Sequence, residues 1–157
     1  MRAAVHIVAS GAAGAAAALA GSPVMGVSIF LSGSLIDIDH VELYLKSGMP
    51  SDPRSLLRGL LHNEEDLGNR YGFRRRIPDY WTFPVLHSVE LIMLCAGLGL
   101  WLSDPALLGI AAGFLLHVVM DLGNYPESPM FFSLAWRCLA RRRLMTAWET
   151  RRPMRGL

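Results

Sequence analysis

The stretch Ser34-Leu35-Ile36-Asp37-Ile38-Asp39-His40 decides how this chain must fold, because it ends an apolar run with two carboxylates and an imidazole. Burying charged groups near the end of a membrane-spanning helix costs free energy, and such residues usually mark a functional site. The pattern recurs in weaker form at four places: His6, His62, His87 to Glu90, and His117 to Asp121. We therefore expect most of these groups to meet around one or two metal ions at one membrane face.

The composition is that of a small membrane protein. The 157 residues are 52% hydrophobic and their mean hydropathy is +0.33, which is high for a soluble protein. The length indicates one domain. The two cysteines, Cys95 and Cys138, give neither a disulfide framework nor a CxxC metal signature.

Four apolar segments predict an all-α, four-span transmembrane helical bundle. A span needs ~20 residues, and the apolar run from Val24 to Ile36 is shorter than that. The second helix must therefore continue through the Asp/His stretch. The expected spans are about 3–20, 24–44, 85–102 and 106–122.

Two details of these helices bear on the fold. Residues 18–20 (Ala-Leu-Ala) resemble a signal-peptide cleavage site, but His6 and an alanine- and glycine-rich core favour a retained helix. Gly109 and Gly113 form a small-xxx-small pair that would let the fourth helix approach a neighbour closely. The alternative is that these glycines only fill the helix.

The remaining segments are polar and basic. Residues 46–84 form an exposed excursion with one short helix near 55–66 and an interfacial aromatic anchor at Tyr80-Trp81. Residues 128–152 mix apolar and arginine side chains, which is typical of an amphipathic helix on an anionic membrane surface. A nucleic-acid partner is disfavoured, because only this arginine run suggests one.

The distribution of positive charge predicts the topology. All fifteen Lys and Arg residues lie in the N-terminal segment, the excursion or the tail, and the turns at 21–23 and 103–105 contain none. The positive-inside rule makes the basic side cytoplasmic, with both termini there and the spans in the cell (inner) membrane. On this topology, the candidate ligands at 6, 37–40, 87, 117 and 121 all lie at the cytoplasmic ends of their helices.

The spacing of these residues suits a metal. His117 and Asp121 are four apart and share a helix face, and His87 and Glu90, or Asp37 and His40, are three apart. On an ideal helix Asp39 would point away from the face shared by Asp37 and His40, although a broken turn could bring its side chain into the site. Imidazole and carboxylate ligands together suit zinc, or iron and manganese. More than four ligands would suggest two ions.

Each candidate also has a purely structural interpretation. His6 can be an interface histidine, and His117 with Asp121 can be a buried hydrogen-bonded pair. Glu90 can orient a ligand or shuttle a proton, and His62 can fold over the site or lie on the surface. Ser88 is better explained as a helix-starting hydroxyl than as a nucleophile.

The motifs resemble those of the predicted membrane-bound metal-dependent hydrolases of the YdjM type. That family has an L-P-D-I-D-H-like element, an R-G-x-T-H-S element and a G-x-x-x-H-x-x-x-D element, and it looks distantly related to zinc-dependent phospholipases C. Here Ile36 replaces the proline, and the second element is split between Arg58-Gly59 and His87-Ser88. The family histidine is therefore His87 or His62; the apolar helix that follows His87 favours the former. The resemblance implies metal-dependent hydrolysis.

We therefore expect hydrolysis of a phosphoester in a lipid or lipid-like substrate at the cytoplasmic face. Catalytic roles are expected for Glu90, His62 and Arg58, and the phosphate ligand is expected to be Arg58 or one of residues 74–76, all arginines. The expected metal ligands are His6, Asp37, Asp39, His40, His87, His117 and Asp121. Membrane lipids are the expected partners, and a homo-oligomer is compatible with the sequence. The rival hypotheses are a non-enzymatic metal-binding or metal-transporting membrane protein and a polar helix-packing network.

Overall fold

Every regular element in the described part of the chain is helical. The computed structural model describes residues 3–46, 50–62, 85–122 and 132–140. The elements are α1 (Ala3–Leu19), α2 (Pro23–Leu35), the 3-10 helix η1 (Ile36–His40), α3 (Val41–Lys46), α4 (Pro53–Leu61), α6 (Val89–Leu102) and α7 (Pro105–Asp121). Residues 134–140 form a further short helix. The all-α class is thus confirmed for these residues.

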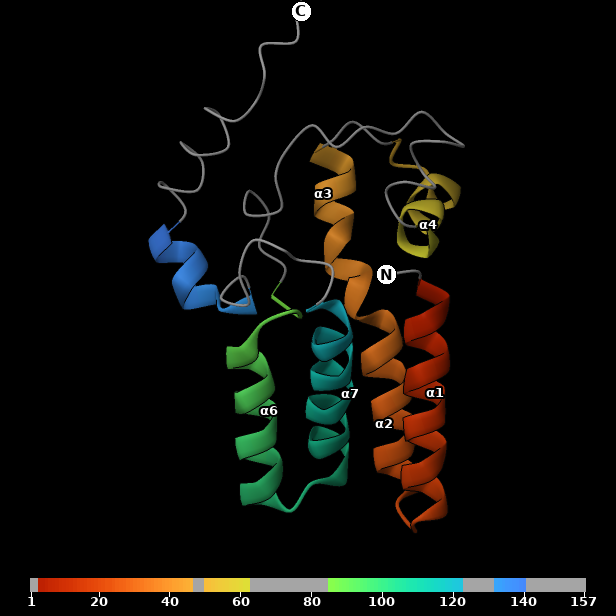
Figure 1. The fold of residues 1–157 in the computed structure, drawn as a ribbon, viewed down its shortest axis with the longest axis vertical. Helices are drawn as coiled ribbons and strands as arrows, with labels where there is room; N and C mark the ends of the chain where they lie inside the picture. The colour runs from red at the N-terminus through yellow and green to blue at the C-terminus, as the bar shows by residue number, and fades with distance from the viewer. Residues whose placement is uncertain (1–2, 47–49, 63–84, 123–131, 141–157) are drawn as a thin grey trace, which may run out of the picture.

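The four longest helices, α1, α2, α6 and α7, stand side by side with alternating direction (Figure 1). α2 packs between α1 and α7, and α6 packs against the other side of α7. The residues from Pro23 to Lys46 form a helical rod that is long and apolar enough to cross a membrane. Among the described residues this is the one such helix, since α1, α6 and α7 are apolar but shorter.

Local chemistry sets the turn between α6 and α7. Ser103 adopts the left-handed conformation (φ 53°) that ends α6. The Asp104 carboxylate then accepts hydrogen bonds from the first amides of α7, and Pro105 occupies the first turn, where its missing N–H costs nothing. The predicted tight turn at 103–105 is confirmed. At the other end of α6, the Ser88 hydroxyl caps the helix by accepting from the Leu91 amide, as predicted.

Glycines let the backbones of α2 and α7 come into direct contact. A Cβ at Gly113 would lie 2.6 Å from the Ile29 carbonyl oxygen and 2.9 Å from the Gly33 nitrogen, and one at Gly109 would lie 2.6 Å from the Met25 carbonyl oxygen. Neither position has room for a side chain. The predicted close approach of this helix to a neighbour is confirmed, and the neighbour is α2.

Large apolar side chains pack the end of the bundle where α2 stops and α6 begins. The buried core there consists of Ile36, Ile92, Phe114, Val118 and Phe132. Phe132 is 2% exposed, so it ties the C-terminal segment to the bundle. The rest of the predicted tail helix, at 128–131 and 141–152, lies outside the described residues, as do Tyr80 and Trp81.

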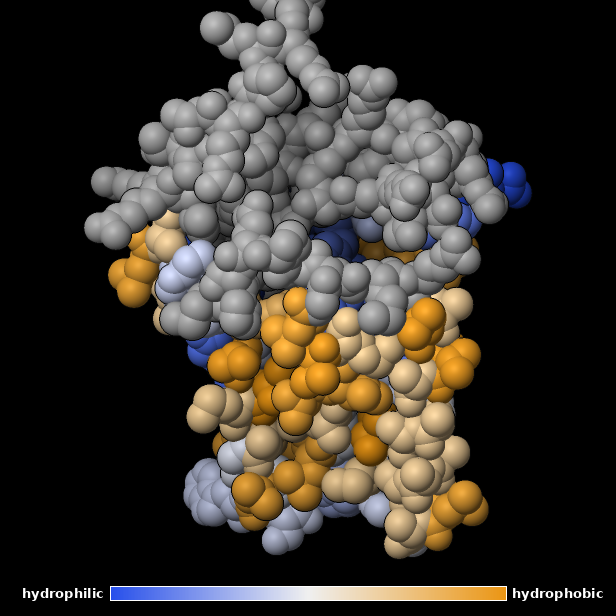
Figure 2. Space-filling view, in the orientation of Figure 1, coloured by the Kyte–Doolittle hydropathy of each residue, from blue (hydrophilic) through white to orange (hydrophobic). Residues whose placement is uncertain are grey.

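Apolar residues cover most of the visible outer surface of the bundle, with more polar atoms at its lower end (Figure 2). Exposed large side chains occur along all four long helices, for example Val8, Val27, Met93, Trp101 and Val119. Several helix boundaries differ from expectation. The short helix expected near 55–66 is α4, which spans Pro53–Leu61. The second span is not a uniform α-helix but tightens to a 3-10 helix over Ile36–His40, and the third begins at Val89 because Ser88 caps it.

Candidate metal centre

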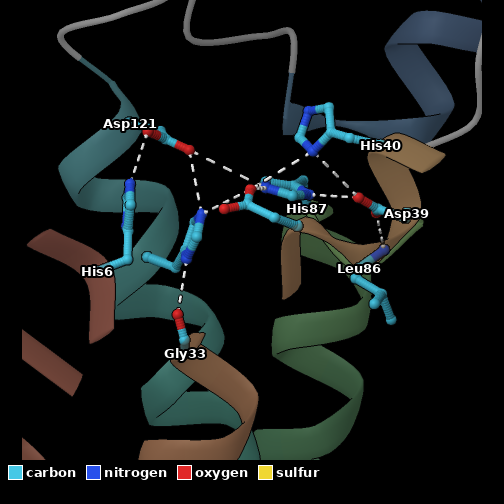
Figure 3. Close-up of polar contacts among 9 residues, drawn as sticks. His6, Gly33, Asp39, His40, Leu86, His87 and Asp121 are labelled. Carbon is cyan, nitrogen blue, oxygen red and sulfur yellow. Dashed lines mark hydrogen bonds and ion pairs between the residues drawn. The ribbon is translucent and has the colours of Figure 1, made fainter. Parts of the chain in front are cut away.

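The bundle gathers all the predicted metal ligands at one end (Figure 3). They come from four separate segments of chain. His6 lies near the start of α1; Asp37, Asp39 and His40 lie in η1; His87 immediately precedes the cap of α6; and His117 and Asp121 lie in the last turns of α7. The 3-10 geometry of η1 is the broken turn that brings Asp39 into the group.

An inner group of four residues has the geometry of a ligand set. Asp37, His87, His117 and Asp121 each offer one ligand atom, and these atoms lie within 4.8 Å of one another. The Nε2 atom of His117 is 3.3 Å from Asp37 Oδ1 and 3.2 Å from Asp121 Oδ2. The Nε2 atom of His87 is 3.4 Å from Asp37 Oδ1 and 4.0 Å from Asp121 Oδ2. Two imidazole nitrogens therefore face two carboxylate oxygens.

The Nδ1 atom of each imidazole ring already donates a hydrogen bond. His117 Nδ1 donates to the Gly33 carbonyl oxygen at 2.8 Å, and His87 Nδ1 donates to Asp39 Oδ1 at 3.0 Å. These bonds fix the ring orientations and leave both Nε2 atoms facing inward. Both Nε2 atoms are fully buried, and the carboxylate oxygens 3.2–3.4 Å away do not meet them in hydrogen-bonding geometry. Buried polar atoms are rarely left unsatisfied, so these two nitrogens point to a bound group.

The distances fit a divalent metal ion. Zinc binds imidazole nitrogen and carboxylate oxygen at about 2.0–2.2 Å, so neighbouring ligand atoms in a tetrahedral site are about 3.3 Å apart. Three of the contacts within the inner group, at 3.2, 3.3 and 3.4 Å, match that spacing. A ligand histidine that donates its other N–H to a carboxylate or backbone carbonyl is also the usual arrangement at metal sites. The residues present thus fit a metal.

Asp39 acts on His87 rather than on the inner group. Its Oδ1 accepts from His87, and its Oδ2 accepts from the Leu86 amide at 3.0 Å. A second cluster of Asp39, His40 and His87 could also hold an ion, but Asp39 Oδ1 in that cluster already accepts the hydrogen bond from His87 Nδ1. The geometry therefore favours one ion in the inner group, with Asp39 holding the His87 ring.

His6 supports the site from α1. Its ring stacks on His117 with centroids 3.8 Å apart, and its Nε2 lies 3.3 Å from Asp121 Oδ1. Asp121 thus directs one oxygen to His6 and the other to His117. His6 is 3% exposed and its Nδ1 makes no hydrogen bond. The side chain is placed to fix the Asp121 carboxylate.

The site opens on the side of η1. The side chain of Asp37 is 25% exposed and that of His40 is 15% exposed, whereas those of His87 and His117 are almost completely buried. His40 Nδ1 lies 3.4 Å from Asp37 Oδ1, at the edge of this opening. Among the four inner residues, Asp37 is therefore the one most accessible from outside, on the side of η1.

The pKa of His87 reports its surroundings. Burial alone lowers the pKa of the imidazole, but the adjacent carboxylates of Asp37 and Asp39 outweigh burial and raise the pKa above its usual value. A metal ligand must be a deprotonated nitrogen, so protons and metal compete for this residue.

The three predicted catalytic residues lie outside both ligand clusters. The Glu90 carboxylate accepts hydrogen bonds from the Ser133 hydroxyl at 2.6 Å and from the amides of Leu134 and Ala135 at 3.0 and 3.2 Å. It therefore caps the helix at residues 134–140. Arg58 lies in α4, and His62 follows it, with Nδ1 3.1 Å from the Arg58 carbonyl oxygen.

Sequence reasoning missed the backbone carbonyl of Gly33 and the hydroxyl of Ser133. The glycine gives a partial signal, because a residue without a side chain lets its carbonyl face a neighbouring helix. The serine gives none that could be distinguished from an ordinary N-cap.

Comparison with known proteins identifies no family: no family model, no curated protein and no solved structure matches the chain.

Proposed function

We propose that this chain is a membrane-embedded metal-dependent hydrolase whose ion is held by Asp37, His87, His117 and Asp121. One observation supports the proposal above all. Two buried imidazole nitrogens converge on one carboxylate oxygen without meeting it in hydrogen-bonding geometry, and their ring orientations are fixed from behind by Asp39 and Gly33. A purely structural network would instead pair the same nitrogens, protonated, with the Asp37 and Asp121 carboxylates in hydrogen-bonding geometry.

The donor set suggests the metal. Two imidazole nitrogens and two carboxylate oxygens suit Zn²⁺ best, and Fe²⁺ or Mn²⁺ also accept this mixture. A bound ion of this kind supplies a water with a pKa near 7 and stabilises negative charge on phosphate oxygens. The chain contributes the ring orientations, the apolar surroundings and the partial exposure of Asp37.

The opening favours hydrolysis over a purely structural metal site. Structural zinc sites are closed, whereas catalytic sites keep a position for water or substrate. Here Asp37 is partly exposed and His40 stands beside it. In this proposal His40 lines the route by which water and substrate reach the ligands.

The position of the cluster suggests the substrate class. We place α1, the rod Pro23–Lys46, α6 and α7 across the membrane, with the cluster at the cytoplasmic end. The exposed apolar side chains along the four helices support this placement. A site at the end of a membrane bundle lies at headgroup depth, where the phosphoesters of lipids lie. The resemblance to YdjM-type hydrolases agrees with this chemistry.

Elemental analysis of protein purified in mild detergent tests the metal. We expect about one equivalent of zinc, iron or manganese in the wild type, and its loss in His117→Ala/Asp121→Ala. Leu139→Ala is the matched control, because Leu139 is 85% exposed in the short helix at 134–140. A metal-free wild type, even after reconstitution, would overturn the proposal.

Turnover is tested separately with a panel of phosphoester lipids in mixed micelles. Release of a headgroup or phosphate should depend on the metal and disappear in Asp37→Asn. Metal binding without turnover, accompanied by metal flux into vesicles, would favour the rival transport function instead.

A further inference from the structure

The four long helices share one short apolar length. α1 and α7 contain 17 residues each, α6 contains 14 and α2 contains 13. At ~1.5 Å per residue these helices are about 20–25 Å long, whereas the hydrocarbon core of a typical bilayer is ~30 Å thick. The rod Pro23–Lys46 is longer only because it continues through η1 and α3, which contain the charged residues Asp37, Asp39, Glu42 and Lys46. The apolar surface of the bundle is therefore about 5–10 Å shorter than the layer that it would cross.

Polar groups mark both ends of this apolar surface. The turns before α2 and α7 lie at one end of the bundle and the metal cluster lies at the other (Figure 1), and the end with the turns is the more polar lower end in Figure 2. Ser103 is exposed there, and the Asp104 carboxylate is held by the first amides of α7. Caps at one end and the cluster at the other fix both boundaries, so neither polar group can reach outward on a long side chain.

A bilayer of ordinary thickness would bury one of these ends. With the turn at Ser103 and Asp104 at one headgroup boundary, the cluster would lie about 5–10 Å inside the hydrocarbon at the other. The Asp37 side chain is 25% exposed and would then face acyl chains. A carboxylate in hydrocarbon is costly, whereas thinning the bilayer around a short protein costs only a modest amount per ångström. Thinning is therefore the less costly arrangement.

We infer that the apolar surface of the bundle binds lipids with short acyl chains and thins the bilayer around it, so that headgroup phosphates lie level with Asp37. The inference rests on the membrane placement in the proposed function. It deepens that function, because the thinned leaflet brings the phosphoesters of neighbouring lipids to the cluster. It does not depend on which metal is bound.

Competition between lipids of different chain length tests the preference. The full-length chain carries one fluorophore on Met93→Cys, in a background with Cys95→Ala and Cys138→Ser, and is reconstituted into phosphatidylcholine vesicles. Brominated eighteen-carbon lipid quenches the label, and unbrominated lipids with chains of fourteen to twenty-two carbons compete with it. Met93 is 70% exposed on α6, and a second label at Val27, 58% exposed on α2, repeats the measurement on another face. Fourteen-carbon chains should bind about threefold or more tighter than twenty-two-carbon chains at both labels.

A label at Leu122 tests the depth of the cluster. Leu122 directly follows Asp121 and is 44% exposed. If the bilayer thins, this label stays at the headgroup boundary, accessible to iodide and quenched by headgroup nitroxides at every chain length.

Two results would overturn the inference. Equal binding of all chain lengths at Met93 and Val27 would show that the bundle has no preference for a thin layer. A Leu122 label that loses iodide access and is quenched by deep nitroxides as the chains lengthen would show that the cluster sinks instead. Failure of the proposed membrane placement is distinguishable from both, because brominated lipid of any chain length would then leave Met93 and Val27 unquenched.

Discussion

The two sides of α7 are packed by different means. Toward α2, the contact is made by backbone against backbone at Gly109 and Gly113, with no room for a methyl group. Toward α6, at the end that bears the metal cluster, the contact is made by large side chains such as Ile92, Phe114 and Phe132. The first interface depends on the absence of side chains. The second depends on their shape at this end, although Gly99 at the other end of α6 also lies against Leu108 with no room for a Cβ.

This difference has a consequence for the site. Asp37, His117 and Asp121 all come from the side that glycine contacts hold together, and His6 joins them from α1. His87 alone comes from the α6 side. Asp39 accepts a hydrogen bond from the His87 ring across the interface, and it also accepts one from the Leu86 amide. The candidate ligand set therefore combines three residues on the glycine-packed side with His87, which Asp39 holds by a hydrogen bond.

Breaking the glycine interface should have the largest effect. In Gly113→Val the new side chain would meet Ser32, the Ile29 carbonyl and the Gly33 nitrogen, so α2 and α7 must separate. We expect a loss of about 1–3 kcal/mol or more in the free energy of unfolding, measured in mixed micelles, together with loss of bound metal.

The matched control for that variant is Gly97→Ala in α6. A Cβ at Gly97 meets nothing within 4 Å, and alanine favours helix by about 1 kcal/mol over glycine. This variant should be at least as stable as wild type and keep its metal. If both glycine variants behave alike, backbone contact is not what positions the ligands.

Removing the hydrogen bond from His87 to Asp39 should lower the metal affinity less than removing a ligand. Asp37→Asn is expected to abolish metal binding, whereas Asp39→Asn should weaken it by about 10–100-fold, because the ligands remain but one ring loses its orientation. Competition with a chromophoric chelator measures both affinities. Equal and complete loss in the two variants would make Asp39 a direct ligand.

The sequence alone could predict a part of this arrangement. Alternating helices with polar residues at corresponding ends predicted the meeting of His6, Asp37, His87, His117 and Asp121, because antiparallel packing brings those ends together. The turn at 103–105 and the Ser88 cap followed from local chemistry. Such features depend on neighbours in sequence or on the order of the helices.

Other features depend on orientation, which the sequence does not contain. Whether Asp39 binds metal or orients His87 depends on the rotation of η1, a 3-10 segment that helical spacing rules do not describe. Glu90 looked like a site residue because it stands three residues from His87. Its partners begin at Ser133, and only the folded chain brings them together. The four-span topology and the hydrolase resemblance stay predictions.

Breaking the Glu90 cap should loosen the α6 side without emptying the metal site. Glu90→Gln weakens the acceptor that holds the Ser133 hydroxyl and two backbone amides. Because the group is partly exposed, we expect a loss of only about 1 kcal/mol in the free energy of unfolding. Hydrogen exchange at residues 134–140 should rise while metal content stays constant. Lost turnover with unchanged exchange would instead restore Glu90 to a role in proton transfer.

The smallest effect on stability is expected at Asp52, which caps α4 and lies in neither of the two α7 interfaces. Hydrogen bonds from Ser55 hold the pKa of this exposed carboxyl below its usual value. A group with a lowered pKa in the folded state stabilises the helix at neutral pH, and that contribution disappears as the pH falls through its folded-state pKa. Asp52→Ala should therefore increase amide exchange at Arg54 and Ser55 at pH 7, and the wild type should approach the variant in strong acid. Unchanged exchange would show that Pro53 and the contact of Gly59 with Tyr44 suffice to hold α4.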